Sequence, residues 1–309
     1  MSTTASVTTR PSHPALAPVA LLITGSLLGL NMNTAKHAIE LGLSPAPFLF
    51  WSALFAGIVL FGVAHLMRQP PKFNRATMTY GLVSGFLTIG LANTLLFLAI
   101  PHVGAGFVSL VGAFPPLYTY LLALILRMEV PHWLRATGVA LGIAGAILLG
   151  ASKSGVGGQE TAWAIVALAV PLIIALGNIY RTRFWPQGAT AFQLAPLMLF
   201  GAALSIGIYI AILESSVVVP TLTLGLSTGV LILQIAILSL MYVMYFVLQK
   251  VAGPVYFSQI GSVGAVLGAA VAVYWFGEAL PSTIIPAGLA IAAGVTCVTL
   301  GQRLVQRRA

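Results

Sequence analysis

Long apolar runs separated by short polar gaps dominate the chain. A bilayer core of about 30 Å needs about 20 apolar residues per helix, and most of the runs have about this length. The pattern predicts membrane-spanning helices over residues 17–36, 45–67, 77–100, 103–126, 132–151, 161–180, 190–213, 223–248, 254–276 and 281–300. The run from 77 to 126 is divided at His102 and Val103, because one crossing cannot hold it all. We therefore expect an all-α integral membrane protein with about ten transmembrane helices.

Composition supports lipid as the environment of these helices. Of the 309 residues, 59% are hydrophobic and 6% are charged, and the mean hydropathy is +1.02. A soluble domain carries about 25% charged residues, so this chain could not cover a water-facing surface. The net charge of +9 would suit a nucleic-acid partner, but the basic residues sit in the short gaps between apolar runs. Cys297 is the lone cysteine and lies in an apolar run, so we expect no disulfide, metal or other cofactor.

Basic residues divide unequally between the two sides of the predicted membrane. One side receives Arg10, Arg68, Lys72, Arg75, Arg127, Arg135, Arg181, Arg183, Lys250, Arg303, Arg307 and Arg308. The other side receives only Lys36 and Lys153. Basic loops stay in the cytoplasm, so we expect both termini to be cytoplasmic in a multi-pass protein of the plasma (inner) membrane. The tail of residues 1–16 is too polar for a signal peptide, and the first span should remain as an anchor.

The two halves of the chain resemble each other. A shift of 149 residues superposes Gly104 on Gly253, Phe107 on Tyr256, Ser109 on Ser258 and Glu129 on Glu278. We therefore divide the chain into a first five-helix repeat (17–151), an extracytoplasmic linker (152–160), a second repeat (161–301) and a basic cytoplasmic tail (302–309). An odd number of spans makes the second copy enter the membrane from the opposite side. Inverted repeats of this kind are typical of transporters, and chance similarity of Gly-rich helices is the alternative.

These motifs carry a family resemblance. Each half has a Glu followed by Pro before a Gly-rich helix, at Glu129 and at Glu278, and Asn33-x-x-Lys36 ends the first helix. With the five-plus-five plan, this resembles the EamA type of the drug/metabolite transporter superfamily over nearly the whole chain. The resemblance implies carriage of small metabolites such as amino acids, sugars, nucleotide sugars, amines or drugs. In size and low charge the chain is similar to bacterial exporters of amino acids and aromatic metabolites.

Ionisable groups are nearly absent from the predicted membrane interior, where they are costly and mark function. Every acidic residue and every His lies near a helix end or in a tail. We therefore expect a pathway without charge, facilitated diffusion or exchange rather than tight proton coupling, and no strongly cationic substrate. Arg181 neighbours Arg183 at a helix end, which favours a side chain that extends to the membrane surface.

Neutral polar groups supply the candidate substrate site. The candidates are Asn33, Lys36, Asn93, Asn178, Tyr242, Tyr245, Tyr256, Ser258 and Gln259. Amides and hydroxyls among aromatic rings suit a small zwitterion or an uncharged polar molecule. The alternative for each is a hydrogen bond that joins neighbouring helices. Lys36 stands out because it lies on the side poor in basic residues, where it could bind a substrate carboxylate or stabilise an outer gate.

Structural and gating roles are predicted for four further residues. Glu129 and Glu278 should brace helix junctions, and Pro115 and Pro254 should kink the fourth and ninth spans as hinges or as static bends. Four Gly-x-x-x-Gly motifs, beginning at Gly25, Gly81, Gly138 and Gly264, should let helices approach closely.

The sequence thus predicts a non-enzymatic carrier for small organic metabolites that works by alternating access. Amino acids with aromatic or hydrophobic side chains are the favoured cargo, with a multidrug, sugar or nucleoside carrier as the alternative. A membrane enzyme is disfavoured because paired carboxylates and nucleophile motifs are missing. A channel is disfavoured by the repeat. Both a monomer and a homodimer remain open.

Overall fold

The computed structural model describes residues 16–126, 131–151, 158–213, 226–258, 260–277 and 284–306. Within them every regular element is a helix and no strand occurs. The elements are α1 (Leu16–Glu40), α2 (Pro45–Leu66), α3 (Arg75–Gly85), the π-helix η1 (Phe86–Leu91), α4 (Ala92–Val103), α5 (Ala105–Val111), α6 (Pro115–Ile125), α7 (Trp133–Ala151), α8 (Gly158–Arg183), α9 (Ala191–Leu213), α10 (Leu226–Ser258), α11 (Ile260–Tyr274) and α12 (Ile284–Gln306). This confirms the predicted all-helical class.

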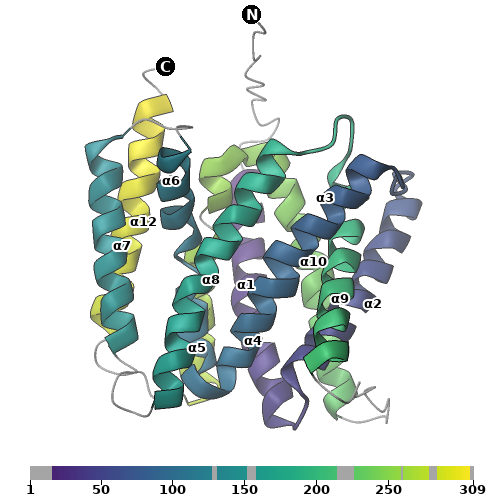
Figure 1. Cartoon of the computed structure of the whole chain (residues 1–309), viewed down its shortest axis with the longest axis horizontal. Helices are drawn as coiled ribbons and strands as arrows, with labels where there is room; N and C mark the ends of the chain where they lie inside the picture. Colours follow the sequence, from purple (N-terminus) through teal and green to yellow (C-terminus); the bar gives the residue numbers. More distant parts are fainter. Residues whose placement is uncertain are drawn as a thin grey trace, which may run out of the picture.

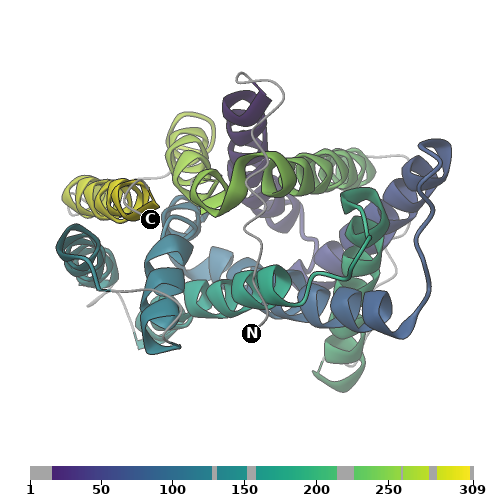
Figure 2. The ribbon, with the colours of Figure 1, turned by 90° about the horizontal axis from the view of Figure 1, so that it is seen from above.

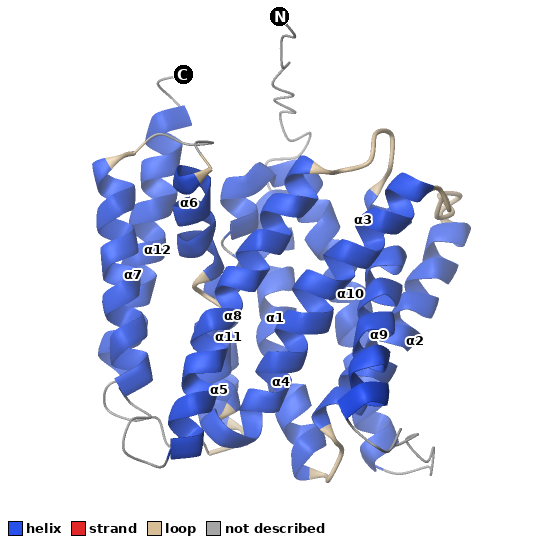
Figure 3. Ribbon diagram, viewed as in Figure 1, coloured by secondary structure: helices blue, strands red, loops and turns tan. Residues whose placement is uncertain are grey.

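The helices run roughly side by side, with both termini at one end of the bundle (Figures 1 and 3). Seen from that end, α1 and α10 face α8 and the α3–η1–α4 segment across the middle of the molecule (Figure 2). Six helical stretches of the described residues are long and apolar enough to cross a bilayer, and two shorter apolar helices accompany them. Large hydrophobic side chains such as Ile165, Ile212 and Val266 are exposed on the outside, as lipid contact requires.

Glycines hold several helix pairs together, as the Gly-x-x-x-Gly motifs predicted. A Cβ on Gly138 of α7 would lie 2.5 Å from the carbonyl oxygen of Gly294 in α12. A Cβ on Gly29 of α1 would lie 2.7 Å from the carbonyl oxygen of Gly264 in α11. Real Cβ atoms do not approach backbone atoms so closely, so these crossings need glycine on at least one side. Close backbone approach replaces the hydrophobic drive that is missing between helices in lipid.

The predicted fourth span is interrupted twice. Gly104 has φ +85°, a conformation that favours glycine, and it separates α4 from α5 next to the predicted division. Residues 112–114 separate α5 from α6, and Pro115 begins α6, where its missing N–H costs no hydrogen bond. Pro115 therefore follows a break in the helix instead of kinking a continuous one.

The predicted break between the eighth and ninth spans lies later than expected. The prediction ends a helix at 248 and begins the next at Pro254, whereas α10 continues to Ser258. A single proline removes one hydrogen bond, and a membrane helix tolerates that loss when neighbouring groups compensate. Glu129 and Glu278, predicted to brace helix junctions, lie outside the described residues.

Candidate functional site

A cavity of about 630 Å³ lies between the two halves of the chain. Its walls come from the middle of α1, from η1 and α4, from the last turns of α8 and from α10, with α5, α6, α7, α11 and α12 closing the remaining side. Trp185 and Ala189 of the α8–α9 loop also line it. That loop lies at the end of the bundle that carries both termini (Figure 1), so the cavity reaches this end. The volume is that of an ordinary small-molecule site.

The opposite end of the bundle is packed. Buried apolar side chains of α1, α2, α4 and α5 meet there in one cluster, which includes Ala38, Leu49, Val103 and Phe107. Small residues such as Ala38 let the helices pack closely at this end. The cavity therefore lies towards the end of the bundle that carries both termini, whereas apolar side chains fill the core towards the other end.

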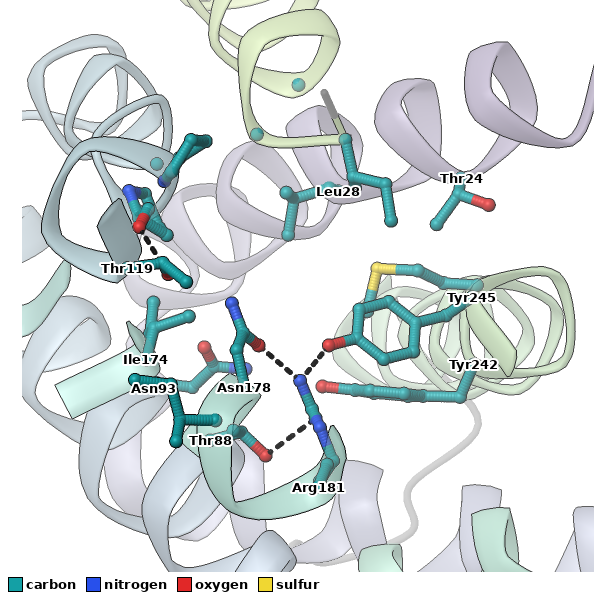
Figure 4. Close-up of a pocket in the computed structure, with 18 of the residues that line it drawn as sticks. Thr24, Leu28, Thr88, Asn93, Thr119, Ile174, Asn178, Arg181, Tyr242 and Tyr245 are labelled. Carbon is teal, nitrogen blue, oxygen red and sulfur yellow. Dashed lines mark hydrogen bonds between the residues drawn. The ribbon is translucent and has the colours of Figure 1, made fainter. Parts of the chain in front are cut away.

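Arg181 is the most deeply buried charged residue of the cavity wall, with 1% of its surface exposed. Its guanidinium donates to Thr88 Oγ1 of η1 at 3.3 Å, to Asn178 Oδ1 one turn earlier in α8 at 2.5 Å, and to the hydroxyl of Tyr245 in α10. Figure 4 shows these three side chains converging on the guanidinium at the cavity. A guanidinium stays charged at any physiological pH, so the cavity wall carries a permanent positive charge.

Aromatic rings surround this charge. The guanidinium carbon of Arg181 lies 4.9 Å from the ring centroid of Tyr245, within cation–π range. The rings of Tyr242 and Tyr245 meet edge to face with centroids 5.7 Å apart, and Tyr242 hydrogen-bonds with Asn93 of α4. Their neighbour Phe246 contacts Trp185. This wall of α10 therefore offers ring faces and hydroxyl groups beside a cation.

Arg135 is a second buried cation of the cavity wall, with 3% of its surface exposed. Its guanidinium carbon lies 3.8 Å over the ring of Tyr120 in α6. The Tyr120 hydroxyl in turn accepts a hydrogen bond from the backbone N–H of His132. A Cβ on Gly301 of α12 would lie 2.5 Å from Arg135 Cγ. Arg135 thus packs tightly between α6, α7 and α12.

Four of the predicted substrate-binding residues line this one cavity, namely Asn93, Asn178, Tyr242 and Tyr245. Pro115 lines it as well. Helices far apart in the sequence supply these side chains. The structure thus brings about half of the predicted set together.

Two predicted residues lie elsewhere. Asn33 is 2% exposed, and its Nδ2 donates to the carbonyl oxygens of Gly29 and Gly268 at 2.9 Å each. It therefore joins α1 to α11. Lys36 lies near the packed end of α1, where its Nζ is 3.7 Å from Glu40 Oε1 and 5.0 Å from the ring centroid of Phe276.

The remaining candidates lie outside the described atoms. Gln259 is not described, and nothing is described of the side chains of Tyr256, Ser258 and Pro254, although these three residues belong to α10. Their predicted roles stay predictions.

Two sequence-based expectations are wrong. Arg181 does not extend to the membrane surface, and the wall of the cavity is not free of charged residues, because Arg181 and Arg135 are both buried there. The spacing of residues along α8 is the signal in the sequence that could have shown that Arg181 is buried. Arg181 follows Asn178 by three residues and shares its face, whereas Arg183 points elsewhere and is exposed. The presence of two arginines at one helix end masks this difference in the sequence.

Comparison with known proteins finds a family match for the first half of the chain. Residues 16–151 match the model of the EamA-like transporter family. A WAT1-related protein of Arabidopsis thaliana is 28% identical over 128 residues, which are 39% of this chain and 36% of that protein. The alignment thus spans little more than a third of the relative's length.

A solved structure, described only as the crystal structure of a protein, supports the fold of the whole chain. It superposes with a TM-score of 0.62 and covers 96% of this chain and 99% of its own, at 21% identity. At this identity the likeness concerns the fold alone. The match of the first half is to a family of transporters and not of enzymes. The chain is thus a multi-pass membrane protein, an all-helical bundle built around a cavity, whose first half is similar to the EamA-like transporter family.

Proposed function

We propose that the chain carries small organic metabolites, with aromatic and hydrophobic amino acids as the favoured cargo, and that the cavity is their route. The observation that carries this proposal is the cavity itself. Most of its described lining is apolar, and a few polar side chains, Asn93, Asn178 and Arg181 among them, converge on one wall. This division suits a molecule with an apolar body and one polar end.

Alternating access between two inverted repeats supplies the mechanism. An in-plane pseudo-two-fold axis would pair spans one and six, two and seven, three and eight, four and nine, and five and ten. It would then exchange the α1–α10 contact with the α4–α8 contact, and the α2–α10 contact with the α3–α9 contact. It would map the α2–α9, α5–α11 and α7–α12 contacts onto themselves. All of these contacts occur, which supports a second copy over residues 161–301.

The position of the cavity defines the state of the carrier. If the basic-rich end with the termini is cytoplasmic, the structure is an inward-facing state. The packed cluster near Ala38 and Phe107 must then open on the other side for release or uptake. Lys36 near that end remains our candidate for a gate, through its contacts with Glu40 and Phe276.

Exchange or facilitated diffusion fits the described lining of the cavity better than tight proton coupling. Its charged residues are Arg135 and Arg181, and guanidinium groups do not release protons in the physiological range. Coupling to protons would need a group that titrates there, such as a carboxylate or His.

Counterflow in proteoliposomes tests the proposal. Vesicles loaded with unlabelled phenylalanine, leucine or alanine receive labelled phenylalanine outside, with and without a pH gradient. We expect saturable entry that depends on the internal amino acid and not on the gradient. Entry that needs the gradient would contradict exchange. Entry of labelled sugars, nucleosides or drugs without any amino-acid entry would replace the favoured cargo with the alternative one.

A further inference from the structure

We infer that the connection between α2 and α3 binds the headgroup of an anionic phospholipid. Residues 66–75, here called the α2–α3 loop, comprise the last residue of α2, the connection itself and the first residue of α3. The loop lies at the end of the bundle that carries both termini (Figure 1), and none of its residues lines the cavity. The inference therefore goes beyond the proposed transport and does not depend on the cargo.

The charge of the α2–α3 loop is positive. Its three basic side chains, Arg68, Lys72 and Arg75, are all exposed. The acidic residues of the described chain, Glu40 and Glu160, lie at the last residue of α1 and in the first turn of α8, at the opposite end of the bundle (Figure 1). No described carboxylate therefore neutralises the loop. Basic residues that cluster next to a membrane-spanning helix attract anionic lipids.

Apolar side chains lie among these bases. Leu66, Met67 and Phe73 are each more than half exposed. The ring of Phe73 lies against α2, with its centroid 6.3 Å from that of Phe61. A phospholipid meets both kinds of group, because its phosphate can contact the bases while its acyl chains cover the apolar side chains. A free phosphate ion would leave the apolar side chains uncovered, so the loop fits a lipid better than a soluble anion.

Hydrogen bonds fix the backbone of the loop. Gln193 of α9 donates through Nε2 to the carbonyl oxygen of Pro70 at 3.2 Å. The hydroxyl of Thr77 in α3 donates to the carbonyl oxygen of Lys72, and its backbone N–H donates to Asn74 Oδ1 at 3.0 Å. The bases thus project from an ordered backbone, and binding a headgroup requires little further ordering of the chain.

Arg68 occupies a position that favours glycine. Its φ of +56° lies in the left-handed region, which is costly for a residue with a side chain. The N–H of Gln69 donates to the Ala64 oxygen at 2.8 Å and the N–H of Arg68 to the His65 oxygen at 3.0 Å, a helix ending in which glycine is usual. A strained backbone of this kind points to a use for the side chain. A guanidinium is a fork of N–H donors that matches a phosphate group.

Native mass spectrometry of the purified full chain in nonionic detergent tests the inference. The probes are dioleoylphosphatidylglycerol and dioleoylphosphatidylcholine, which have the same acyl chains and differ in net charge. We expect the native protein to bind the anionic lipid about 10- to 100-fold more tightly, because each base contributes about fivefold. Inorganic phosphate at the same concentration should not displace the anionic lipid.

Variants assign the preference to the α2–α3 loop. Lys72→Gln should weaken binding of the anionic lipid about fivefold, and the combined change of all three bases to Gln should remove most of the preference. Arg183→Gln is the matched control, since it removes one exposed charge at the same end of the bundle but outside the loop. It should bind both lipids as the native protein does.

Arg68→Gly separates lipid binding from stability. It should also weaken binding of the anionic lipid about fivefold. Its melting temperature without added lipid should equal or slightly exceed the native value, because glycine adopts the left-handed conformation without strain. A purely structural role of Arg68 at the end of α2 would instead lower the melting temperature and leave the lipid affinity unchanged.

Four results would overturn the inference. They are equal affinity of the native protein for the two lipids, an undiminished preference in the triple variant, equal losses in Lys72→Gln and Arg183→Gln, and displacement of the lipid by inorganic phosphate. Size-exclusion profiles show whether each variant is folded, and the single variants decide the question if the triple variant does not fold. These outcomes are separate from counterflow, so failure of the proposed transport would leave the lipid site standing.

Discussion

The contact between α1 and α11 predicts the effect of one added methyl group. A Cβ on Gly29 would lie 2.7 Å from both the Gly264 oxygen and the Gly268 nitrogen, so Gly29→Ala must push the helices apart. Overpacking of this kind costs about 1–3 kcal/mol. Separation also lengthens the hydrogen bond from Asn33 to Gly268, now 2.9 Å, which is worth about 0.5–1.5 kcal/mol. The higher helix propensity of alanine returns up to about 1 kcal/mol.

We therefore expect Gly29→Ala to lower the stability by about 2 kcal/mol, and the melting temperature in detergent by about 5 °C. Gly62→Ala is the matched control, because Gly62 is exposed in α2 and a Cβ there has no neighbouring atom within 4 Å. It should melt at the native temperature or slightly above. Equal melting of the two variants would refute the close α1–α11 contact and the structural role of Asn33.

Two further predictions concern polar residues of α1. Gln234 of α10 is fully buried and donates to Asn31 Oδ1 at 2.6 Å, so Gln234→Leu should lower the stability by about 1–3 kcal/mol. Adding Asn31→Leu should restore most of the melting temperature, and a further fall in the melting temperature would contradict this pairing. Lys36→Gln removes the contacts with Glu40 and Phe276 and should slow counterflow several-fold while leaving the affinity for the substrate unchanged. A native rate of counterflow would contradict the gate hypothesis.

The spans could be predicted from the sequence because each one needs a long apolar run. The predicted ranges 45–67 and 190–213 agree with α2 and α9 to within one residue at each end. The breaks were harder to predict. Gly104 marks a real interruption, but Pro254 looked like a helix start and lies inside α10. Local sequence shows where a helix can bend, whereas neighbouring helices decide whether it does.

The candidate site could be predicted only in part. Asn93, Asn178, Tyr242 and Tyr245 were found because polar groups are conspicuous inside apolar runs. Arg181 was missed because its position near a helix end is compatible with two opposite directions of the side chain. The hydroxyls of Thr88 and Tyr245 decide between these directions, and they lie 93 and 64 residues away along the chain. Such long-range contacts leave no pattern in a single sequence.

The claim that this cavity is the transport route is tested most directly by blocking it from within. Ile174 lines the cavity and points into it (Figure 4), so Ile174→Cys in a Cys297→Ser background places one thiol on the route. Gln187→Cys, exposed in the α8–α9 loop, is the control. We predict that a bulky thiol reagent abolishes counterflow of Ile174→Cys, that substrate slows this modification, and that labelled Gln187→Cys keeps its transport rate. Full transport by labelled Ile174→Cys would contradict the account.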